Sequence, residues 1–100
     1  MFIAMNRFKV NPERSADFEA AWRDRRSYLK EVPGFVRFAL LRGDVPGEFI
    51  SHSTWESRDA FKAWTQSEAF HKAHGQGMGG DILEGPPQVS LYEAVIVEPA

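Results

Sequence analysis

The sequence predicts an α+β domain over residues 1–100 with the ferredoxin-like β-α-β-β-α-β order, in which an antiparallel sheet carries both helices on one face. Three observations lead to this fold class. Apolar residues alternate in residues 1–10, as in a half-buried strand, and residues 88–97 are expected to form a last strand. A long stretch with helical spacing follows the first strand and stops at Pro33-Gly34. Two further apolar runs then flank a turn at residues 43–47, which predicts a hairpin.

The first predicted strand contains one unusual residue, Asn6. Alternation places Asn6 on the same face as Phe2, Ala4, Phe8 and Val10. A buried amide without hydrogen-bond partners costs a few kcal/mol, so we expect a partner to satisfy it. That partner is either a nearby loop or backbone group, or a ligand in a pocket, and the residues alone leave both interpretations open.

The first predicted helix begins at Asn11-Pro12, since asparagine caps helices and proline fits the first turn. Apolar and long side chains then recur at helical spacing, namely Phe18, Ala21, Trp22, Arg25, Tyr28, Leu29 and Val32. We therefore expect one helix up to Pro33-Gly34. Its arginines are either a solvated face or include one partner for an anionic ligand group.

The hairpin is predicted from strands at residues 35–42 and 48–56. Ser57 is expected to cap a helix that carries Phe61 and Trp64, and Ser67 a second, short helix. The last strand, residues 88–97, completes the sheet.

One face of this sheet lacks a cover in the predicted arrangement. Its apolar residues are expected to include Ile3, Met5, Phe38, Leu40 and Ile96. One hundred residues leave no further element to cover them, so a second copy packed sheet against sheet is the simplest solution. We expect a homodimer.

The composition is that of an ordinary globular protein, with 43% hydrophobic and 26% charged residues. A net charge of −2 gives no basic field for nucleic acid and no polybasic membrane anchor. No apolar run reaches the roughly 20 residues of a membrane span, and the first ten residues do not resemble a signal peptide. The absence of cysteine excludes disulfides and thiolate metal sites and is consistent with the reducing cytoplasm, where we expect the protein to reside.

The stretch from Trp64 to Pro87 carries most of the chemistry. It holds Trp64, Phe70, His71 and His74 and then becomes glycine-rich. A short helix with imidazoles followed by a loop suits a planar ligand, although a single histidine on such a helix is more often structural, and Trp64 could be plain core. The sequence contains no HExxH motif, no Ser-His-Asp or Cys-His arrangement and no phosphate-binding glycine motif.

Several of these segments together resemble a known family. Asn6-Arg7, Pro33-Gly34-Phe35, Thr54-Trp55-Glu56-Ser57 and Ala60-Phe61 are similar to the antibiotic biosynthesis monooxygenase superfamily of dimeric α+β barrels. Within that superfamily, Asn6, Trp64 and His74 resemble the Asn/Trp/His set of the IsdG-type heme-degrading monooxygenases. Trp64 and His74 have the ten-residue spacing of that group, and Phe70 also matches it.

The resemblance implies roles for individual residues. His74 would bind the heme iron, which His71 fits less well because it breaks the spacing. Trp64 would press on the porphyrin and Asn6 would donate a hydrogen bond to the reacting dioxygen. Trp22 would lie beside the heme, and the propionates would lie within reach of Arg25 or Arg26, or of loop amides from Gly75 onward. Heme would act as substrate and cofactor, with O2 and electrons from an external donor such as an unidentified reductase.

Two other functions stay open at this point. The first is a cofactor-independent monooxygenase acting on a quinol or an aromatic polyketide, which needs no histidine ten residues after the tryptophan. The second is a heme-binding protein without turnover. A small stress-related dimer with an incidental pocket is a third, structural interpretation.

Overall fold

The computed structural model describes residues 1–25, 27–74 and 82–99, apart from the side chains of residues 73 and 74. Seven helices and strands follow one another in these ranges: β1 (Phe2–Lys9), α1 (Ser15–Asp24), β2 (Phe35–Arg42), β3 (Glu48–Trp55), α2 (Arg58–Thr65), α3 (Glu68–His74) and β4 (Gln88–Glu93). Two single 3₁₀ turns, η1 (Pro12–Arg14) and η2 (Leu29–Glu31), flank α1.

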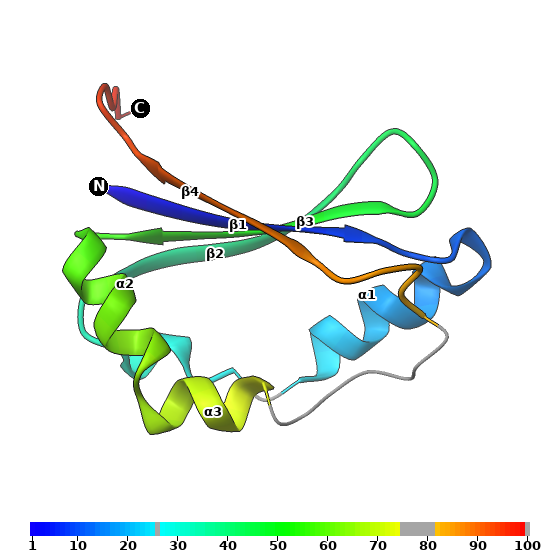
Figure 1. Cartoon of the computed structure of the whole chain (residues 1–100), viewed down its shortest axis with the longest axis horizontal. Helices are drawn as coiled ribbons and strands as arrows, with labels where there is room; N and C mark the ends of the chain where they lie inside the picture. The colour runs from blue at the N-terminus through cyan, green and yellow to red at the C-terminus, as the bar shows by residue number, and fades with distance from the viewer. Residues whose placement is uncertain (26, 75–81, 100) are drawn as a thin grey trace.

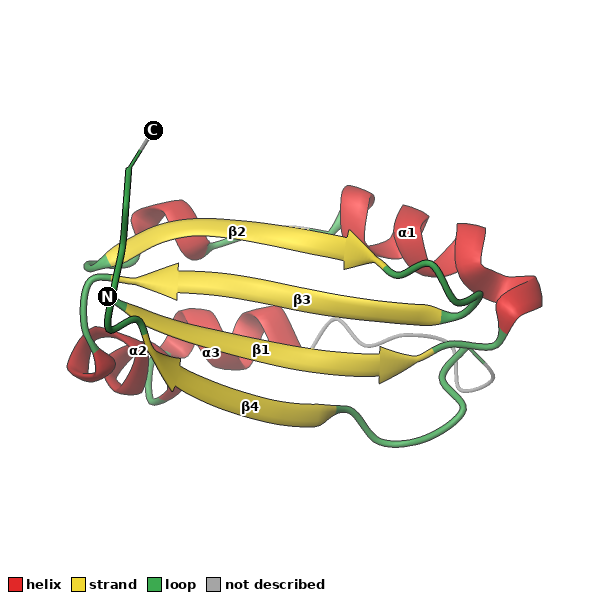
Figure 2. Ribbon diagram, turned by 90° about the horizontal axis from the view of Figure 1, so that it is seen from above, coloured by secondary structure: helices red, strands yellow, loops and turns green. Residues whose placement is uncertain are grey.

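The four strands form one antiparallel sheet in the order β2-β3-β1-β4. The helices α1, α2 and α3 all lie on the same side of this sheet, below it in Figure 1. Figure 2 looks onto the opposite face and shows the four strands side by side in front of the helices. The predicted α+β, ferredoxin-like fold is therefore confirmed.

Two aromatic clusters fill the space between sheet and helices, one toward each end of the sheet. The first cluster, under α1, has a core of Phe8, Val10, Phe18, Phe49 and Ile82. The second cluster, next to α2, has a core of Phe2, Leu29 and Trp55, against which Phe61 and Trp64 pack. Because each cluster takes alternate residues from β1 and β3, the predicted alternation in these strands is confirmed.

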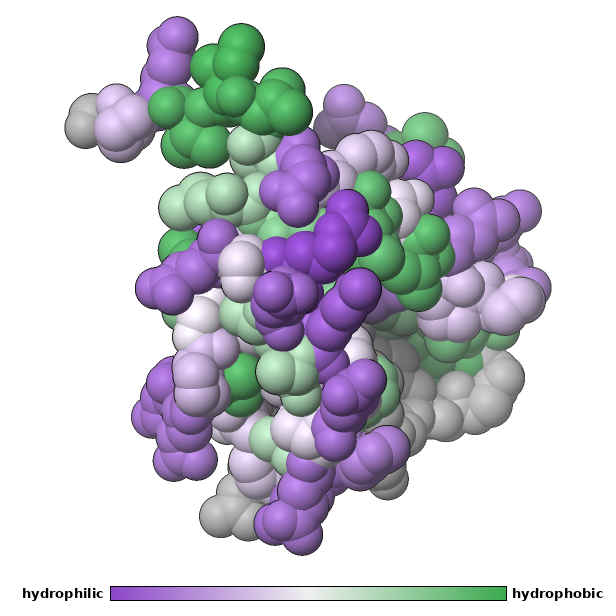
Figure 3. All heavy atoms as spheres, turned by 60° about the vertical axis from the view of Figure 1, so that its left-hand side comes forward, coloured by the Kyte–Doolittle hydropathy of each residue, from purple (hydrophilic) through white to green (hydrophobic). Residues whose placement is uncertain are grey.

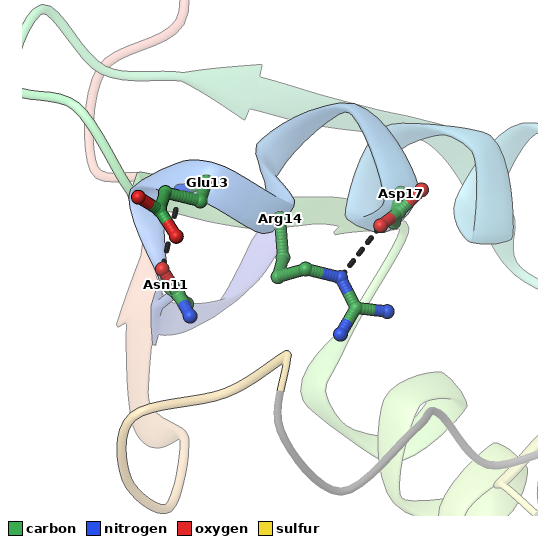
Figure 4. A network of polar contacts seen from close by, with 4 residues as sticks. All are labelled: Asn11, Glu13, Arg14 and Asp17. Atoms are coloured by element: carbon green, nitrogen blue, oxygen red, sulfur yellow. Dashed lines mark hydrogen bonds and ion pairs between the residues drawn. The ribbon is translucent and has the colours of Figure 1, made fainter.

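The start of the first helical region agrees with the sequence prediction. The Asn11 side chain accepts a hydrogen bond from the backbone N–H of Glu13 at 3.1 Å and so caps η1. Arg14 Nε then donates to Asp17 Oδ2 at 2.6 Å across the first turn of α1, as Figure 4 shows. These contacts hold the entry of α1 close to the end of β1.

The predicted continuous helix up to Pro33 is wrong, because α1 ends at Asp24 and Arg25 is extended, with φ −66° and ψ 152°. The cause lies in packing. Trp22 packs against the first cluster, whereas Leu29 is buried in the second, at the other end of the sheet. A break after Asp24 lets the chain supply both clusters, and this overrides the helical spacing of the sequence.

The prediction that Phe38 and Leu40 lie on the uncovered face is also wrong. A register irregularity between Phe35 and Arg37 shifts the alternation of β2, so that Phe38 pairs with Ser53 and Leu40 with Ser51. Both side chains therefore face the helices and pack against the aromatic clusters. A bulge of this kind adds one residue to a strand and reverses the faces beyond it.

The last strand is shorter than predicted and ends at Glu93. Residues 95, 96 and 97, all valine or isoleucine, leave the sheet and are 89%, 80% and 53% exposed. Along the residues that are described, none of the helices is long and apolar enough to cross a membrane.

Candidate functional site

The centre of the helix-facing sheet surface is polar, in contrast to its two aromatic ends. Ala4 and Asn6 of β1 and Ser51 and Ser53 of β3 lie between the two aromatic clusters. We call these four residues the polar band. Asn6 is half-buried, as its alternation predicts, and its amide makes no hydrogen bond with any described residue. A polar group in such a position normally has a partner, so a ligand group is expected next to Asn6.

Trp22 of α1 reaches over the sheet and stacks on Phe38 of β2, with ring centroids 5.5 Å apart and planes 15° apart. Its ring also meets Phe8 of β1 edge-on at 5.8 Å. The indole Nε1 of Trp22 is buried and has no hydrogen-bond partner among the described residues. Trp22 therefore forms one wall of the candidate site, and its place beside a heme stays a prediction.

Arg25 lies beside this wall. Its guanidinium carbon is 4.7 Å from the Trp22 ring centroid and 4.8 Å from that of Phe38. The backbone at Arg25 is extended, and its side chain lies over the rings of both Trp22 and Phe38.

Arg25 is a partly buried cation, and no carboxylate among the described residues is paired with it. Partial burial lowers the pKa of Arg25 from its ordinary value, and no carboxylate of the described residues opposes this shift. A desolvated charge without an opposite charge is costly, and the cost is recovered when an anion binds. Arg25 is therefore suited to hold a carboxylate of a ligand.

The opposite wall comes from α2 and α3. Trp64 is half-buried and packs against Trp55 at 5.2 Å and, edge-on, against Phe70 at 4.8 Å. Ser67 joins the two helices, since its hydroxyl donates to the Trp64 carbonyl at 2.5 Å and accepts from the Phe70 N–H at 3.2 Å. The predicted cap at Ser67 is confirmed, as is the cap at Ser57, whose hydroxyl accepts from the Ala60 N–H at 3.1 Å.

His74 is the last residue of α3, and its side chain lies outside the described residues, as do residues 26 and 75 to 81. The ligand role of His74 and the contacts expected of Arg26 and Gly75 therefore stay predictions. Positions 70 and 74 are one helical turn apart, so the backbone sets them on the same side of α3. His71, the less favoured candidate, is exposed and contacts the ring of Phe70.

A cavity of about 460 Å³ lies next to the predicted site rather than at it. It is found between α1 and the edge strand β2 and is lined by Glu19, Trp22, Arg23, Phe38, Leu40, Arg42 and Phe49. Among the described residues that were predicted for the site, only Trp22 lines this cavity. The Trp22 ring thus stands at the border between the cavity and the polar band.

Asn6 lies between two groups of predicted site residues, Trp22 with Arg25 and Trp64 with Phe70. Phe38 contacts Trp22 and also packs against the second cluster. Sequence reasoning missed Phe38, because the bulge in β2 cannot be read from alternation. It also missed Ser51. A signal existed for Ser51, since Phe49, Ser51, Ser53 and Trp55 share one strand face, and serines between two aromatics on a buried face are unusual.

Comparison with known families gives one match for most of the chain. The sequence profile described as antibiotic biosynthesis monooxygenase matches residues 1–76. These residues include β1 to α3, and so every strand and helix that carries a predicted site residue.

Individual proteins are also similar. A heme oxygenase (mycobilin-producing) of Mycobacterium tuberculosis is 30% identical over 89 residues, which cover 82% of this chain and 84% of the relative. The heme degrader MhuD of M. tuberculosis, solved with two hemes in its active site, superposes with a TM-score of 0.80 at 22% identity, covering 99% of this chain and 100% of that one. SnoaB, a cofactor-independent oxygenase of Streptomyces nogalater, superposes with a TM-score of 0.72 at 24% identity over 99% and 97% of the two chains. The two structural likenesses, at this level of identity, establish the fold alone.

Proposed function

Since the chain belongs to the antibiotic biosynthesis monooxygenase family, we propose that it is a heme-degrading monooxygenase. In this proposal the protein binds heme, uses O2 and electrons from an external donor, opens the porphyrin ring and releases the iron. The proposal is supported by curated relatives at about 30% identity that are named for heme degradation.

One arrangement in the structure carries the proposal. The Asn6 amide, which has no hydrogen-bond partner among the described residues, lies between two aromatic walls. Arg25 lies beside one of them and has no carboxylate partner among the described residues. Heme is planar, largely apolar and carries two carboxylates at one edge. Aromatic side chains stand on both sides of the site, Trp22 on one and Trp64 with Phe70 on the other. Such side chains are suited to pack against the apolar ring of heme. Arg25, desolvated and without a carboxylate partner among the described residues, suits a propionate. The residues present therefore fit this group.

Each residue has a proposed part in the reaction. Heme, when bound, supplies the iron at which dioxygen is reduced and the carbon that is oxidised. His74 would hold the iron through a neutral imidazole. Asn6 would donate its amide N–H to a ligand group on the sheet side, and Trp64 would contact the porphyrin. Trp22 and Phe70 would exclude water from its rim, and Arg25 would orient the propionates.

We also propose that the protein forms a homodimer. Ile3, Met5 and Ile50 lie on the sheet face opposite the helices, and neither α1, α2 nor α3 covers that face (Figures 1 and 2). His52 lies on the same face, and its Nδ1 is buried without a hydrogen-bond partner in the described part of the chain. The exposed residues 95–97 form a hydrophobic protrusion at the C-terminal end, seen at the upper left of Figure 3. A second copy would bury both surfaces.

Two alternatives are kept. The fold shared with SnoaB favours a cofactor-independent oxygenase, in which Asn6 would hold an oxygen atom of an aromatic substrate. A heme-binding protein without turnover would use the same walls and the same histidine. Both alternatives differ from the proposal in one measurable step.

The test is an optical titration of the purified protein with hemin, followed by ascorbate in air. We expect a Soret shift that saturates at one heme per chain, then loss of the Soret band and an open-chain tetrapyrrole spectrum. His74→Ala is expected to abolish the shift, and Asn6→Ala to keep heme binding while it slows the bleaching at least tenfold. His71→Ala serves as the matched control and is expected to leave the titration unchanged.

The other outcomes identify the alternatives. A Soret shift that persists under reductant contradicts turnover and leaves a heme-binding protein. The absence of any shift contradicts the proposal and favours an oxygenase of quinols or other aromatic substrates.

A further inference from the structure

The residues that surround Ser51 define its position on the helix-facing surface of the sheet. Ser51 of β3 pairs with Asn6 of β1 on one side and with Leu40 of β2 on the other. Side chains directly opposite each other in antiparallel strands have Cβ atoms about 5 Å apart. Ser51 is therefore the nearest polar neighbour of Asn6 within the sheet.

Trp22 lies above Ser51. Asn6, Ser51 and Leu40 form one row of paired residues across the sheet. The Trp22 ring contacts Phe8, in the row on one side of it, and Phe38, in the row on the other side. Phe8 is on β1 and Phe38 is on β2, so a ring that contacts both lies over the part of β3 between them, which includes Ser51. The burial of Ser51, which is 5% exposed, agrees with this placement.

The two serines of the polar band differ in how their hydroxyls are used. Ser53 Oγ accepts a hydrogen bond from Trp55 Nε1 at 3.0 Å and donates to the Ala4 carbonyl at 3.4 Å. Ser51 Oγ makes no hydrogen bond with any described residue, and it is not among the fully buried polar atoms that lack a partner, so the oxygen keeps some accessible surface. A hydroxyl that no protein group uses adds little to stability over alanine in the same space.

The Asn6 amide and the Ser51 hydroxyl thus lie side by side on the sheet, and neither hydrogen-bonds a described residue. Trp22, whose ring contacts Phe8 and Phe38 on the same face, has a buried Nε1–H that likewise lacks a partner among the described residues. We infer that Ser51 is a ligand-contacting residue, which hydrogen-bonds the same polar part of the bound molecule as Asn6. This inference rests on the proposed function and extends it. Asn6 and Ser51 would then offer two adjacent hydrogen-bonding groups to a small molecule bound between the heme and the sheet. That molecule would be dioxygen in the reaction, and azide or carbon monoxide in the test.

The test uses heme-loaded protein and two small probes, azide on the ferric form and carbon monoxide on the ferrous form. A hydrogen bond to a charged group contributes about 1.5 kcal/mol, which corresponds to about tenfold in affinity. We therefore expect Ser51→Ala to weaken azide binding about tenfold and to shift the C–O stretching band to higher frequency. Ser53→Ala, the matched control, is expected to change neither value, because its hydroxyl is already used within the protein.

A second measurement separates a contact with ligand from a structural role. Ser51→Ala is expected to leave the Tm of the heme-free protein unchanged or higher, whereas Ser53→Ala lowers it, since Trp55 loses its acceptor. A fall in Tm for Ser51→Ala as large as that for Ser53→Ala would overturn the inference. So would unchanged azide affinity and C–O stretching frequency in a Ser51→Ala protein that still binds heme, and this result would leave the proposed function intact. Failure of the wild-type protein to bind heme would overturn both.

Discussion

At the scale of single residues, Gly34 and Gly47 are the two described glycines whose positive φ and close neighbours leave no room for a side chain, and Gly34 provides the test. Its φ is +81°, and a Cβ atom placed there would collide with the Cβ of Ala60 at the start of α2. We predict that Gly34→Ala lowers the free energy of unfolding by about 2–4 kcal/mol, the combined cost of a left-handed backbone and overpacking. Urea denaturation measures it.

Gly85 provides the control for this prediction, because its φ is ordinary and no atom lies within 4 Å of the position that a Cβ would take. Gly85→Ala is expected to change the free energy of unfolding by less than about 1 kcal/mol. Equal losses in the two variants would contradict the steric explanation.

Arg25 is the residue whose charge most directly favours an anionic ligand. We predict that Arg25→Ala weakens heme binding roughly 10- to 100-fold, since one charge-assisted hydrogen bond contributes about 1.5–3 kcal/mol. Arg25→Lys is expected to recover only part of this affinity, because an ammonium group does not stack on Trp22 and Phe38 as a guanidinium does. Optical titration measures it, with the exposed Arg23→Ala as control. Equal affinities for Arg25→Ala and Arg23→Ala would exclude a propionate contact.

At the scale of elements, one ion pair joins α1 to the edge strand β2. Arg42 binds both carboxylate oxygens of Glu19, at 2.7 and 2.5 Å. The hydrogen bond from Arg42 lowers the pKa of Glu19 from its ordinary value, and the same pair raises the pKa of Arg42. A carboxyl whose pKa is lower in the folded state stabilises the fold above its unfolded pKa and ceases to do so as pH falls through its folded pKa.

Glu19→Gln is therefore expected to destabilise the protein slightly at neutral pH. The difference in Tm from wild type should shrink as pH falls below about 4, the ordinary range for glutamate. Thermal unfolding at several pH values measures this difference. Glu13→Gln, which removes a carboxylate without an ion pair to any described residue, is expected to show no such trend. A Glu19→Gln effect that does not change with pH would contradict the ionic explanation.

The Ser67 hydroxyl fixes the start of α3 relative to the end of α2, and so the position of the predicted iron ligand. We predict that Ser67→Ala costs about 1 kcal/mol of stability and also weakens heme binding severalfold. Ser57→Ala removes the cap of α2 at a similar cost in stability and is expected to affect heme binding less. Paired denaturation and heme titrations distinguish the two effects. Equal heme affinities in the two variants would show that the Ser67 cap does not position the site.

The elements differ in how far the sequence predicts them, and the difference has physical causes. An apolar run between Pro33-Gly34 and the turn at residues 43–47 located residues 35–42 as a strand correctly, because these signals are local in the sequence. The end of α1 at Asp24 could not be predicted, since Tyr28 and Leu29 continue the helical spacing. The helix ends because Leu29 packs in the second cluster, with residues that are distant in the sequence. The bulge in β2 depends on which strand it pairs with, and that information is not local.

Residues of the candidate site could be predicted where the residue type is unusual for its position in a strand. They were missed where the residue type is common at such a position. Asn6 stands out because an amide interrupts an apolar strand face. Ser51 stands out less, because a single serine is common on strands. Its signal is the pair of serines, Ser51 and Ser53, between Phe49 and Trp55 on one strand face.

At the scale of the whole molecule, the uncovered sheet face predicts self-association. We expect a mass of twice 11.3 kDa in sedimentation equilibrium. Ile50→Lys places a charge in the centre of that face, opposite Leu41 and Arg7, and is expected to give monomers. Val45→Lys, at a 61% exposed valine in the turn between β2 and β3, is the control and should stay dimeric. A monomeric wild-type protein would contradict the sheet-to-sheet arrangement.

The contact between Trp55 and Trp64 has a spectroscopic consequence. Their ring centroids are 5.2 Å apart and their planes make an angle of 31°, so the strong ultraviolet transitions of the two indoles are coupled. Coupled transitions of this kind give a pair of circular dichroism bands of opposite sign. Because Trp55 is fully buried and Trp64 belongs to the wall of the site, the amplitude of this pair changes whenever Trp64 moves. The protein thus contains an intrinsic optical reporter for occupancy of the site, which requires no added label.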